Sequence, residues 1–227
     1  MFHVKQSKEN NESFKKIIDL LHEENHHHNL SGIKDWQGMY AQHIEDSLAI
    51  AEYIEANHPG EDKKILDLGS GAGFPGIVIA ICSPNKKVIM IESNNKKVSF
   101  IKKASESIGL KNTEAVLSRI EEFPELGAAD IVCAKALSSL DVLLEYACPL
   151  LKVGGSLISM KSLDIEEELA NAAIVWTELG FEAPTHVAYS ACGKKRQLVV
   201  FKKSKSSKIK LPRNNGEAKN KPLRGLL

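Results

Sequence analysis

The stretch that decides the fold is Lys64-Ile65-Leu66-Asp67-Leu68-Gly69-Ser70-Gly71-Ala72-Gly73-Phe74-Pro75-Gly76, and the apolar run Ile77–Ile81 follows it. A short apolar run that ends in a carboxylate and then meets four glycines within eight residues predicts a strand, a tight loop and a helix. Glycine lets a ligand approach the backbone closely, and the N-terminus of a helix offers free amides. We therefore expect this loop to lie against a ligand.

The identity of that ligand decides the function. The spacing Gly71-x-Gly73-x-x-Gly76 also matches the dinucleotide-binding fingerprint, and such a loop can be purely structural. Asp67 argues against a dinucleotide because it would repel a pyrophosphate, and Pro75 lacks an amide that a pyrophosphate would use. S-adenosylmethionine instead carries a sulfonium and an ammonium, whose charge Asp67 would offset. The pattern thus favours a Rossmann-like methyltransferase.

A second apolar run, Lys87–Glu92, also ends in an acid, and it does so roughly 20 residues further on, where folds of this kind place a ribose ligand. We expect Glu92 to hold the ribose of the cofactor, although an acid can also simply end a strand. The stretch Ser118-Arg119-Ile120-Glu121 follows the next strand and could reach the adenine or begin a helix. The residues expected to shape the cofactor cradle are Gly69, Gly71, Gly73 and Phe74.

Composition limits the class of protein. The chain has 227 residues, of which 43% are hydrophobic and 26% charged, as is typical of a globular α/β domain. No apolar run reaches the length of a membrane-spanning helix, and Met1–Gln6 lacks the apolar core of a signal peptide, so we expect a cytoplasmic protein without a membrane partner. Four widely separated cysteines predict reduced, mostly buried thiols and no metal site.

The net charge of +1 hides an asymmetry along the chain. From Lys202 onward there are nine basic residues and a single acid, Glu217, whereas the rest of the chain is acidic overall. A basic tail on an acidic protein favours a polyanionic partner, through phosphate contacts and counterion release. A solvated, disordered tail is the alternative.

Strands and helices alternate after Pro59-Gly60. We expect strands at 64–68, 87–92, 113–118, 130–135 and 155–161, helices around 75–82, 95–108, 139–147 and 164–178, and a final hairpin of strands 182–190 and 196–203. This order predicts a mainly parallel, seven-stranded sheet with an antiparallel last strand. The expected domains are an N-terminal helical extension 1–60, a Rossmann-like methyltransferase domain 61–203 and a basic tail 204–227.

The N-terminal extension reads as two helices. Apolar residues at helical spacing from Phe14 predict the first, which should end before His26-His27-His28, a solvated run in the break between the helices. Asp35 is a plausible N-cap for the second, which runs to Asn57. Within it, His43 and Asp46 share one face and could line a site, but the sequence favours a surface pair.

Two cations follow neighbouring strands of the predicted sheet. Lys135 ends the fourth strand and Lys161 ends the fifth, so both are expected at the mouth of the same cleft. Such a pair could hold a nucleic-acid phosphate or an electron-rich base, although an ordinary solvated lysine explains either one.

Together these motifs resemble a specific family, and the similarity extends over nearly the whole chain. The matching segments are His43-Ile44-Glu45-Asp46-Ser47-Leu48, the Asp67–Gly76 loop, Glu92–Phe100, Ser118–Glu122, Ala134-Lys135-Ala136, Leu150–Gly155, Met160-Lys161 and the ending with Pro212-Arg213, Gly216 and Pro222-Leu223. The chain resembles the bacterial small-subunit rRNA methyltransferase family RsmG, also called GidB. The Gly-Phe-Pro-Gly loop and the His-Ile-x-Asp-Ser-Leu pattern make this resemblance far more specific than a generic cofactor loop.

The resemblance implies a class I fold and transfer of a methyl group from S-adenosylmethionine to N7 of a guanine in 16S rRNA. It implies cofactor contacts at Gly69, Phe74, Ile120-Glu121 and Lys135; the family usually has arginine at position 135, and commonly also at position 42, where this chain has Gln42. The expected partner is 16S rRNA or the small ribosomal subunit, not DNA, and we expect a monomer. The candidate RNA contacts are Lys135, Lys161, Arg196 and Arg213. Methylation of another RNA or of a small molecule is the alternative.

Overall fold

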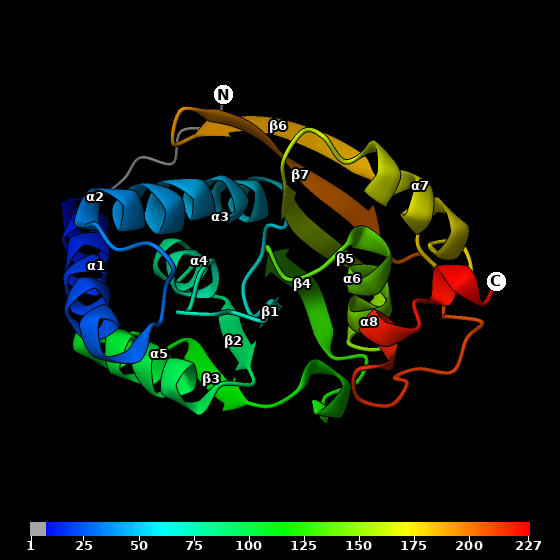
Figure 1. The fold of residues 1–227 in the computed structure, drawn as a ribbon, viewed down its shortest axis with the longest axis horizontal. Coiled ribbons are helices and arrows are strands. Elements are labelled where there is room, and N and C mark those ends of the chain that lie inside the picture. Colours follow the sequence, from blue (N-terminus) through cyan, green and yellow to red (C-terminus); the bar gives the residue numbers. More distant parts are fainter. Residues whose placement is uncertain (1–7) are drawn as a thin grey trace.

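A seven-stranded sheet organises the computed structural model, which describes residues 8–227 (Figure 1). The order of its strands is β3-β2-β1-β4-β5-β7-β6. Their bounds are β1 Lys64–Leu68, β2 Lys87–Glu92, β3 Thr113–Leu117, β4 Ala129–Lys135, β5 Leu151–Lys161, β6 Thr185–Ala191 and β7 Lys194–Lys202.

All neighbours from β3 to β5 pair in parallel, whereas β7 pairs antiparallel with both β5 and β6. The predicted edge hairpin is present, and its second strand, β7, lies inside its first. The order reverses next to β1, so the carboxyl ends of β1, β2 and β4 border a crevice in which ligands of open α/β sheets bind. The expected fold class is confirmed.

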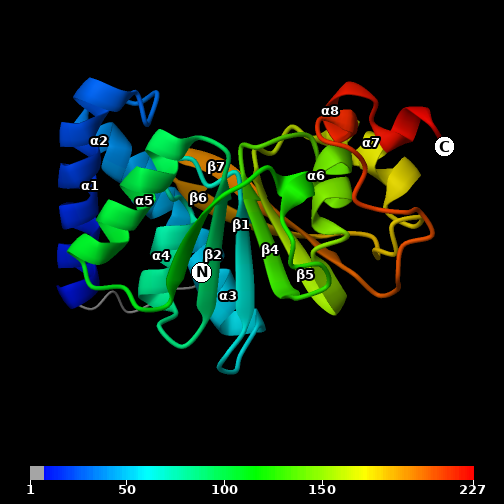
Figure 2. The ribbon, with the colours of Figure 1, turned by 90° about the horizontal axis from the view of Figure 1, so that it is seen from below.

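Helices cover both faces of the sheet (Figures 1 and 2). On one face lie α1 to α5 with the helical segment η1, and on the other lie α6, α7 and the C-terminal segments. The bounds are α1 Lys8–His28, α2 Trp36–Met39, η1 Tyr40–Glu45, α3 Asp46–Asn57, α4 Gly76–Cys82, α5 Asn95–Ser107, η2 Ile120–Glu122, α6 Leu140–Ala147, α7 Glu166–Val175, α8 Glu217–Asn220 and η3 Leu223–Gly225.

The strand sequences divide the core into two layers. Alternate side chains of a strand point to opposite faces of a sheet, so in β1 Ile65 packs against the N-terminal helices while Leu66 and Leu68 pack against α6 and α7. Because both faces are covered, the central strands are apolar at almost every position. Asp67 is the exception among the buried residues of β1: its side chain has no exposure and lies on the face that α1 to α5 cover.

The N-terminal helices depart from expectation in two places. His26, His27 and His28 form the last turn of α1, not a break after it, because the helix continues beyond its apolar stripe. The second predicted helix starts at the expected cap, where Asp35 Oδ1 accepts from the Gly38 N–H at 2.7 Å. It is continuous through α2 and α3, but the segment Tyr40–Glu45 between them is a π-helix, a form that occurs frequently at functional sites.

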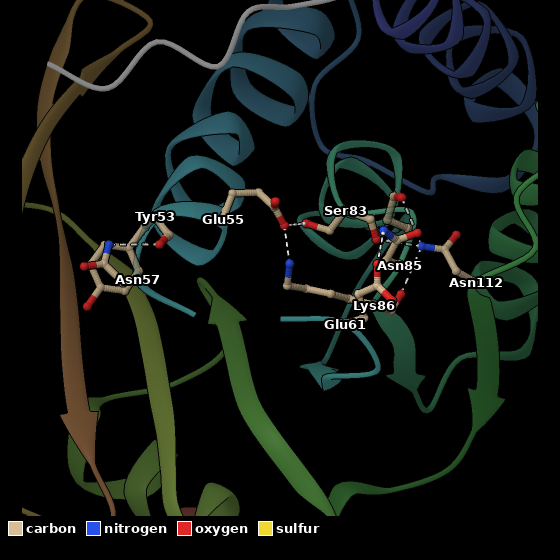
Figure 3. Close-up of polar contacts among 9 residues, drawn as sticks. Tyr53, Glu55, Asn57, Glu61, Ser83, Asn85, Lys86 and Asn112 are labelled. Carbon is tan, nitrogen blue, oxygen red and sulfur yellow. Dashed lines mark hydrogen bonds and ion pairs between the residues drawn. The ribbon is translucent and has the colours of Figure 1, made fainter. Parts of the chain in front are cut away.

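Contacts at the amino ends of the strands, opposite the crevice, fix α3 (Figure 3). The carboxylate of Glu55 accepts from Ser83 Oγ at 2.6 Å and pairs with Lys86, whose side chain is almost fully buried. The amide of Asn112 donates to three backbone carbonyls of residues 80–86, which closes the loop between α4 and β2. The contacts of Glu55 thus fix the position of α3 relative to the sheet, and α3 is continuous with the π-helical segment.

Two strand boundaries differ from the prediction because of local backbone geometry. Strand β5 begins at Leu151, before Gly154 and Gly155, since a register shift between Ala129 and Ile131 accommodates the extra residues. Strand β6 begins at Thr185, because Pro184 has no N–H to contribute to a ladder.

Residues 1–7 of the predicted extension, which include the segment Met1–Gln6 without a signal-peptide core, lie outside the described residues. Within residues 8–227, no helix combines the length and apolar character needed to cross a membrane.

Candidate active site

The glycine loop after β1 adopts the backbone that its sequence predicts. Gly69, Gly71 and Gly73 all have positive φ, between 60° and 91°. A Cβ at Gly69 would lie 2.5 Å from Leu137 Cδ1, and one at Gly73 would lie 2.6 Å from Ile77 Cδ1. A Cβ at Gly71 would instead meet no described atom within 4 Å. The loop is therefore packed from below and open at Gly71, as a ligand cradle requires.

Asp67 holds this loop from beneath. Its Oδ2 accepts from the Gly76 N–H at 2.9 Å, at the start of α4, while Oδ1 has no hydrogen-bond partner within residues 8–227. Burial raises the pKa of Asp67 to about 6, against the lowering effect of the Gly76 amide. Asp67 is thus fully enclosed, so any effect on a cationic ligand would come from its charge and not from contact.

Glu92 links the loop to the next helix. Its Oε2 accepts from the Gly71 N–H at 3.0 Å, and its Oε1 accepts from the Asn94 N–H at 2.9 Å. Asn94 in turn caps α5 by accepting from the amides of residues 96 and 97. A carboxylate has about four lone-pair sites, so two remain for a ligand after these bonds.

A cavity of about 280 Å³ lies over these two strand ends. It brings together five residues that the sequence predicts for the cofactor: Gly69, Gly71, Glu92, Ile120 and Glu121. Ser118 and Arg119 belong to the stretch Ser118–Glu121 that the sequence places near the adenine. The sequence analysis missed the other lining residues, which are Ile91, Ser93, Lys97, Leu137, Tyr146, Asn215, Gly216 and Lys219. The last three come from the basic tail.

Four predicted cofactor residues lie outside this lining: Asp67, Gly73, Phe74 and Lys135. Phe74 is buried and its ring stacks on that of His43, with centroids 4.7 Å apart and planes 14° from parallel. Burial and the nearby Lys135 lower the pKa of His43 to about 4, so its imidazole is neutral at physiological pH. Its Nε2 lies 2.9 Å from the Ser31 hydroxyl oxygen.

Next to His43 is a group that we call the Asp46 cluster, formed by Asp46, Lys135, Tyr189 and Arg196. Lys135 Nζ lies 2.9 Å from Asp46 Oδ2, Arg196 Nε lies 3.3 Å from Oδ1, and the Tyr189 hydroxyl donates to Oδ1 at 2.9 Å. Lys135 also donates to the carbonyl of Gln42 in the π-helical segment. The interpretation of His43 and Asp46 as a surface pair is wrong, because only 3% of the Asp46 side chain is exposed.

Burial controls the protonation of this cluster. It lowers the pKa of Lys135, against the raising effect of Asp46. It also raises the pKa of Tyr189, which Asp46 raises further.

Ala136, directly after Lys135, has φ of 52°, a left-handed conformation that is uncommon for a residue with a side chain. The chain therefore turns sharply at the end of β4 and leaves the ammonium of Lys135 against Asp46.

The other two predicted RNA contacts already have partners. Lys161 donates to the Ser138 carbonyl at 2.8 Å and pairs with Glu168 at 2.5 Å, and 11% of its side chain is exposed. Arg213 forms a two-pronged pair with Glu145, with both N···O distances at 2.7 Å. Both side chains hold the fold together, and their contact with RNA stays a prediction.

The fold and the cavity define the class of protein. The structure is similar to the crystal structure of the S-adenosylmethionine-dependent methyltransferase SibL, with a TM-score of 0.59 and 14% identity over 77% of this chain and 60% of that one. It is also similar to TYW2 from M. jannaschii, solved in complex with AdoMet, with a TM-score of 0.53 and 18% identity over 69% and 74% of the two chains. The fold is that of the class I S-adenosylmethionine-dependent methyltransferases.

Sequence comparison then defines the family. The family model GidB, described as rRNA small subunit methyltransferase G, matches residues 10–199. A relative from Caldicellulosiruptor bescii is 35% identical over 92% of this chain and 90% of its own, and one from Bacillus subtilis is 34% identical over 94% and 91%. Both are named Ribosomal RNA small subunit methyltransferase G. The chain belongs to this family, which confirms the resemblance, the enzyme class and the cofactor expected from the sequence.

Proposed function

We propose that this enzyme transfers the methyl group of S-adenosylmethionine to N7 of a guanine in 16S rRNA. Two facts support the proposal together. The cavity and the Asp46 cluster lie at the same carboxyl edge of the sheet, and the chain matches the rRNA small subunit methyltransferase G family over residues 10–199. A cofactor site beside a pair of partly exposed cations suits a polyanionic acceptor.

The cavity residues suit the proposed cofactor. S-adenosylmethionine supplies an electrophilic methyl group when it is bound. Gly71 leaves open space above the loop, and the remaining lone pairs of Glu92 can accept from ribose hydroxyls. The neighbouring Ile120 and Glu121 line the cavity where we place the adenine. Asp67 lies enclosed beneath the loop and adds a negative charge under the cationic end of the ligand.

The proposed chemistry needs no proton acceptor. Guanine N7 carries a lone pair in the plane of the ring and no proton, so the enzyme has only to align N7, the methyl carbon and the sulfur. Accordingly we assign no proton-transfer residue. The stacked pair of Phe74 and His43, the latter with a pKa of about 4, is a neutral pair of rings beside the Asp46 cluster.

We assign the acceptor side to Lys135 and Arg196. Arg196 Nε lies 3.3 Å from Asp46 Oδ1 as an ion pair without a hydrogen bond, and the two Nη groups of the guanidinium can donate to a phosphate. The pairing with Asp46 also keeps both cations in one place before RNA arrives, so less side-chain entropy is lost on binding. Lysine at position 135 keeps the positive charge of the family's usual arginine but provides a point charge in place of a fork.

The same proposal includes the cellular location, the oligomeric state, the kind of nucleic acid and the domain division of the enzyme. We place the enzyme in the cytoplasm, where ribosomal subunits are assembled, and we propose that it acts there as a monomer on RNA and not on DNA. We also keep the division into a helical extension 1–60, a methyltransferase domain 61–203 and a basic tail 204–227.

The test is methyl transfer from radiolabelled S-adenosylmethionine to small ribosomal subunits from cells that lack this protein. After digestion, we expect the label in 7-methylguanosine from 16S rRNA. Binding of the cofactor without any labelled rRNA would overturn the substrate assignment and point to another RNA or to a small molecule. Calorimetry of cofactor binding, run on the same preparation, separates an inactive sample from a wrong substrate.

A further inference from the structure

The basic tail is docked on the protein, and its docking converges on the cofactor cavity. Residues 205–227 cross α6 and α7, and α8 lies against α6 (Figures 1 and 2). Ala218 and Leu223 of the tail are buried in the core layer of that face. The tail is therefore a packed part of the fold, and the role of each of its charged residues depends on the contacts that the residue makes.

Two arginines anchor the tail on either side of the segment that contains Asn215, Gly216 and Lys219. Arg213 pairs through two nitrogens with Glu145, whose side chain is 4% exposed, and also donates to the Lys221 carbonyl at 2.9 Å. Arg224 pairs with Asp141, whose side chain is 1% exposed. Paired guanidinium and carboxylate groups at this depth are strong only as complete pairs. The anchors thus fix the chain between residues 213 and 224 on α6.

The segment between the anchors touches the residues predicted for the adenine. The Gly216 N–H donates to Glu121 Oε1 at 2.9 Å, and the Asn215 amide donates to Glu122 Oε1 at 3.1 Å. Gly216 has φ of 80°, so the chain turns there directly against η2. Asn215, Gly216 and Lys219 then line the cavity opposite the glycine loop.

The position of this segment along the cavity follows from the strand order. Gly69 and Gly71 follow β1, Glu92 ends β2, and the η2 segment with Ile120 and Glu121 follows β3 at the edge of the sheet. A ligand that spans these three strand ends has its far end beside η2, and the tail covers that end. Burial, with Glu121 and Glu145 nearby, raises the pKa of Tyr146 to about 12, so a neutral phenol of α6 completes this corner.

We propose that tail residues 213–219 form the adenine-side wall of the cofactor site, so that docking of the tail and binding of S-adenosylmethionine are coupled. The proposal rests on the assignment of the cavity to this cofactor. In it, Lys219 is a binding residue, Arg213 is a positioning residue that acts through the tail, and the Glu121 carboxylate holds Gly216 in addition to facing the cavity.

The experiment compares three full-length variants that each remove one positive charge from the tail. Arg213→Met breaks an anchor, Lys219→Met removes an exposed side chain from the cavity lining, and Lys208→Met, a control, removes an exposed lysine that pairs with Glu178 away from the cavity. Calorimetry measures Kd for S-adenosylmethionine and for 5′-methylthioadenosine, which has the adenine end without the amino acid.

We expect Arg213→Met to weaken both ligands about tenfold, the effect of losing about 1.4 kcal/mol. Lys219→Met should weaken both by about two- to fivefold, as for loss of a cation beside an aromatic ring at an exposed site. Lys208→Met should leave both Kd values unchanged. Unchanged Kd values in all three variants would overturn the proposal. Should Arg213→Met fail to fold, Lys219→Met decides alone, because its side chain is exposed.

Methyl transfer to small subunits separates this inference from the proposed function. With Arg213→Met, saturating S-adenosylmethionine should restore kcat while KM for the cofactor stays high, an outcome that general destabilisation would not produce. A loss of transfer that cofactor does not restore, with unchanged Kd values, would instead make the tail an RNA contact. Altered Kd values in an enzyme that labels no rRNA would support the tail wall and refute the substrate.

Discussion

The most informative perturbation is Asp67→Asn, because Asp67 is the one acid in β1 and is enclosed beneath the cofactor loop. The asparagine has the same shape, and its carbonyl oxygen can still accept from the Gly76 N–H. The substitution removes the ionisation of the group and leaves its main hydrogen bond. Its effect on stability should therefore depend on pH.

The magnitude follows from the pKa of Asp67, which burial raises from 3.8 to about 6. The folded protein holds this proton more tightly than the unfolded chain does, so the stabilisation is fully present below pH 3.8 and is lost as the pH rises through about 6. A shift of about two units corresponds to about 3 kcal/mol. His43 acts in the opposite sense, since its lowered pKa of about 4 costs stability on acidification, but both proteins contain it.

The assay is chemical unfolding of the cofactor-free protein and of Asp67→Asn across the range from about pH 4 to about pH 7.5. The difference in unfolding free energy between the two proteins should change by about 3 kcal/mol over this range, in favour of the variant at the higher pH. A constant difference would refute the reasoning that Asp67 is a charged group held in a desolvated position. Calorimetry on the same variant should show weaker binding of S-adenosylmethionine.

Three further predictions concern other parts of the site. Asp46→Asn leaves Lys135 and Arg196 without their carboxylate partner and should lower the unfolding free energy by about 3 kcal/mol. The control Asp164→Asn, at an exposed position, should change it by less than about 0.5 kcal/mol. Denaturant titration measures both variants. Gly76→Ala places a Cβ 2.5 Å from Met90 Cγ, so overpacking should cost about 1–3 kcal/mol by the same method. The C2 proton of His43, followed by NMR, should titrate near pH 4 and show no step near 6.5, its ordinary value; a normal midpoint would show that the ring is solvated.

Local sequence patterns predicted the parts of the molecule that depend on local physics. The glycine loop, Asp67 near the end of β1, Glu92 at the end of β2 and the Asp35 cap each bond to backbone within ten residues along the chain. Alternating apolar runs predicted the strands for the same reason, and strand order then placed Glu92 beside the loop. Five of the nine predicted cofactor residues accordingly line one cavity.

The rest depends on contacts between distant segments. Asp46 meets Tyr189 across 143 positions of the chain, so its i, i+3 spacing with His43 could not reveal that Asp46 is buried and His43 half-buried. The π-helical turn that positions them leaves no clear mark in the apolar stripe. The tail is a similar case, because its charge predicted a polyanionic partner whereas Arg213 meets Glu145, 68 residues earlier. A count of charges does not identify which of them are already paired.

The central claim is methylation of guanine N7 in 16S rRNA, and the most direct test is the 7-methylguanosine content of that rRNA, measured by mass spectrometry. The rRNA would come from cells that lack the gene and carry either wild-type protein, the Gly71→Val variant or an empty vector. Because Gly71 faces open space at a φ of 60°, a branched side chain there should fill the cradle. We expect wild-type protein alone to restore the modified nucleoside, and equal amounts in all three strains would contradict the account.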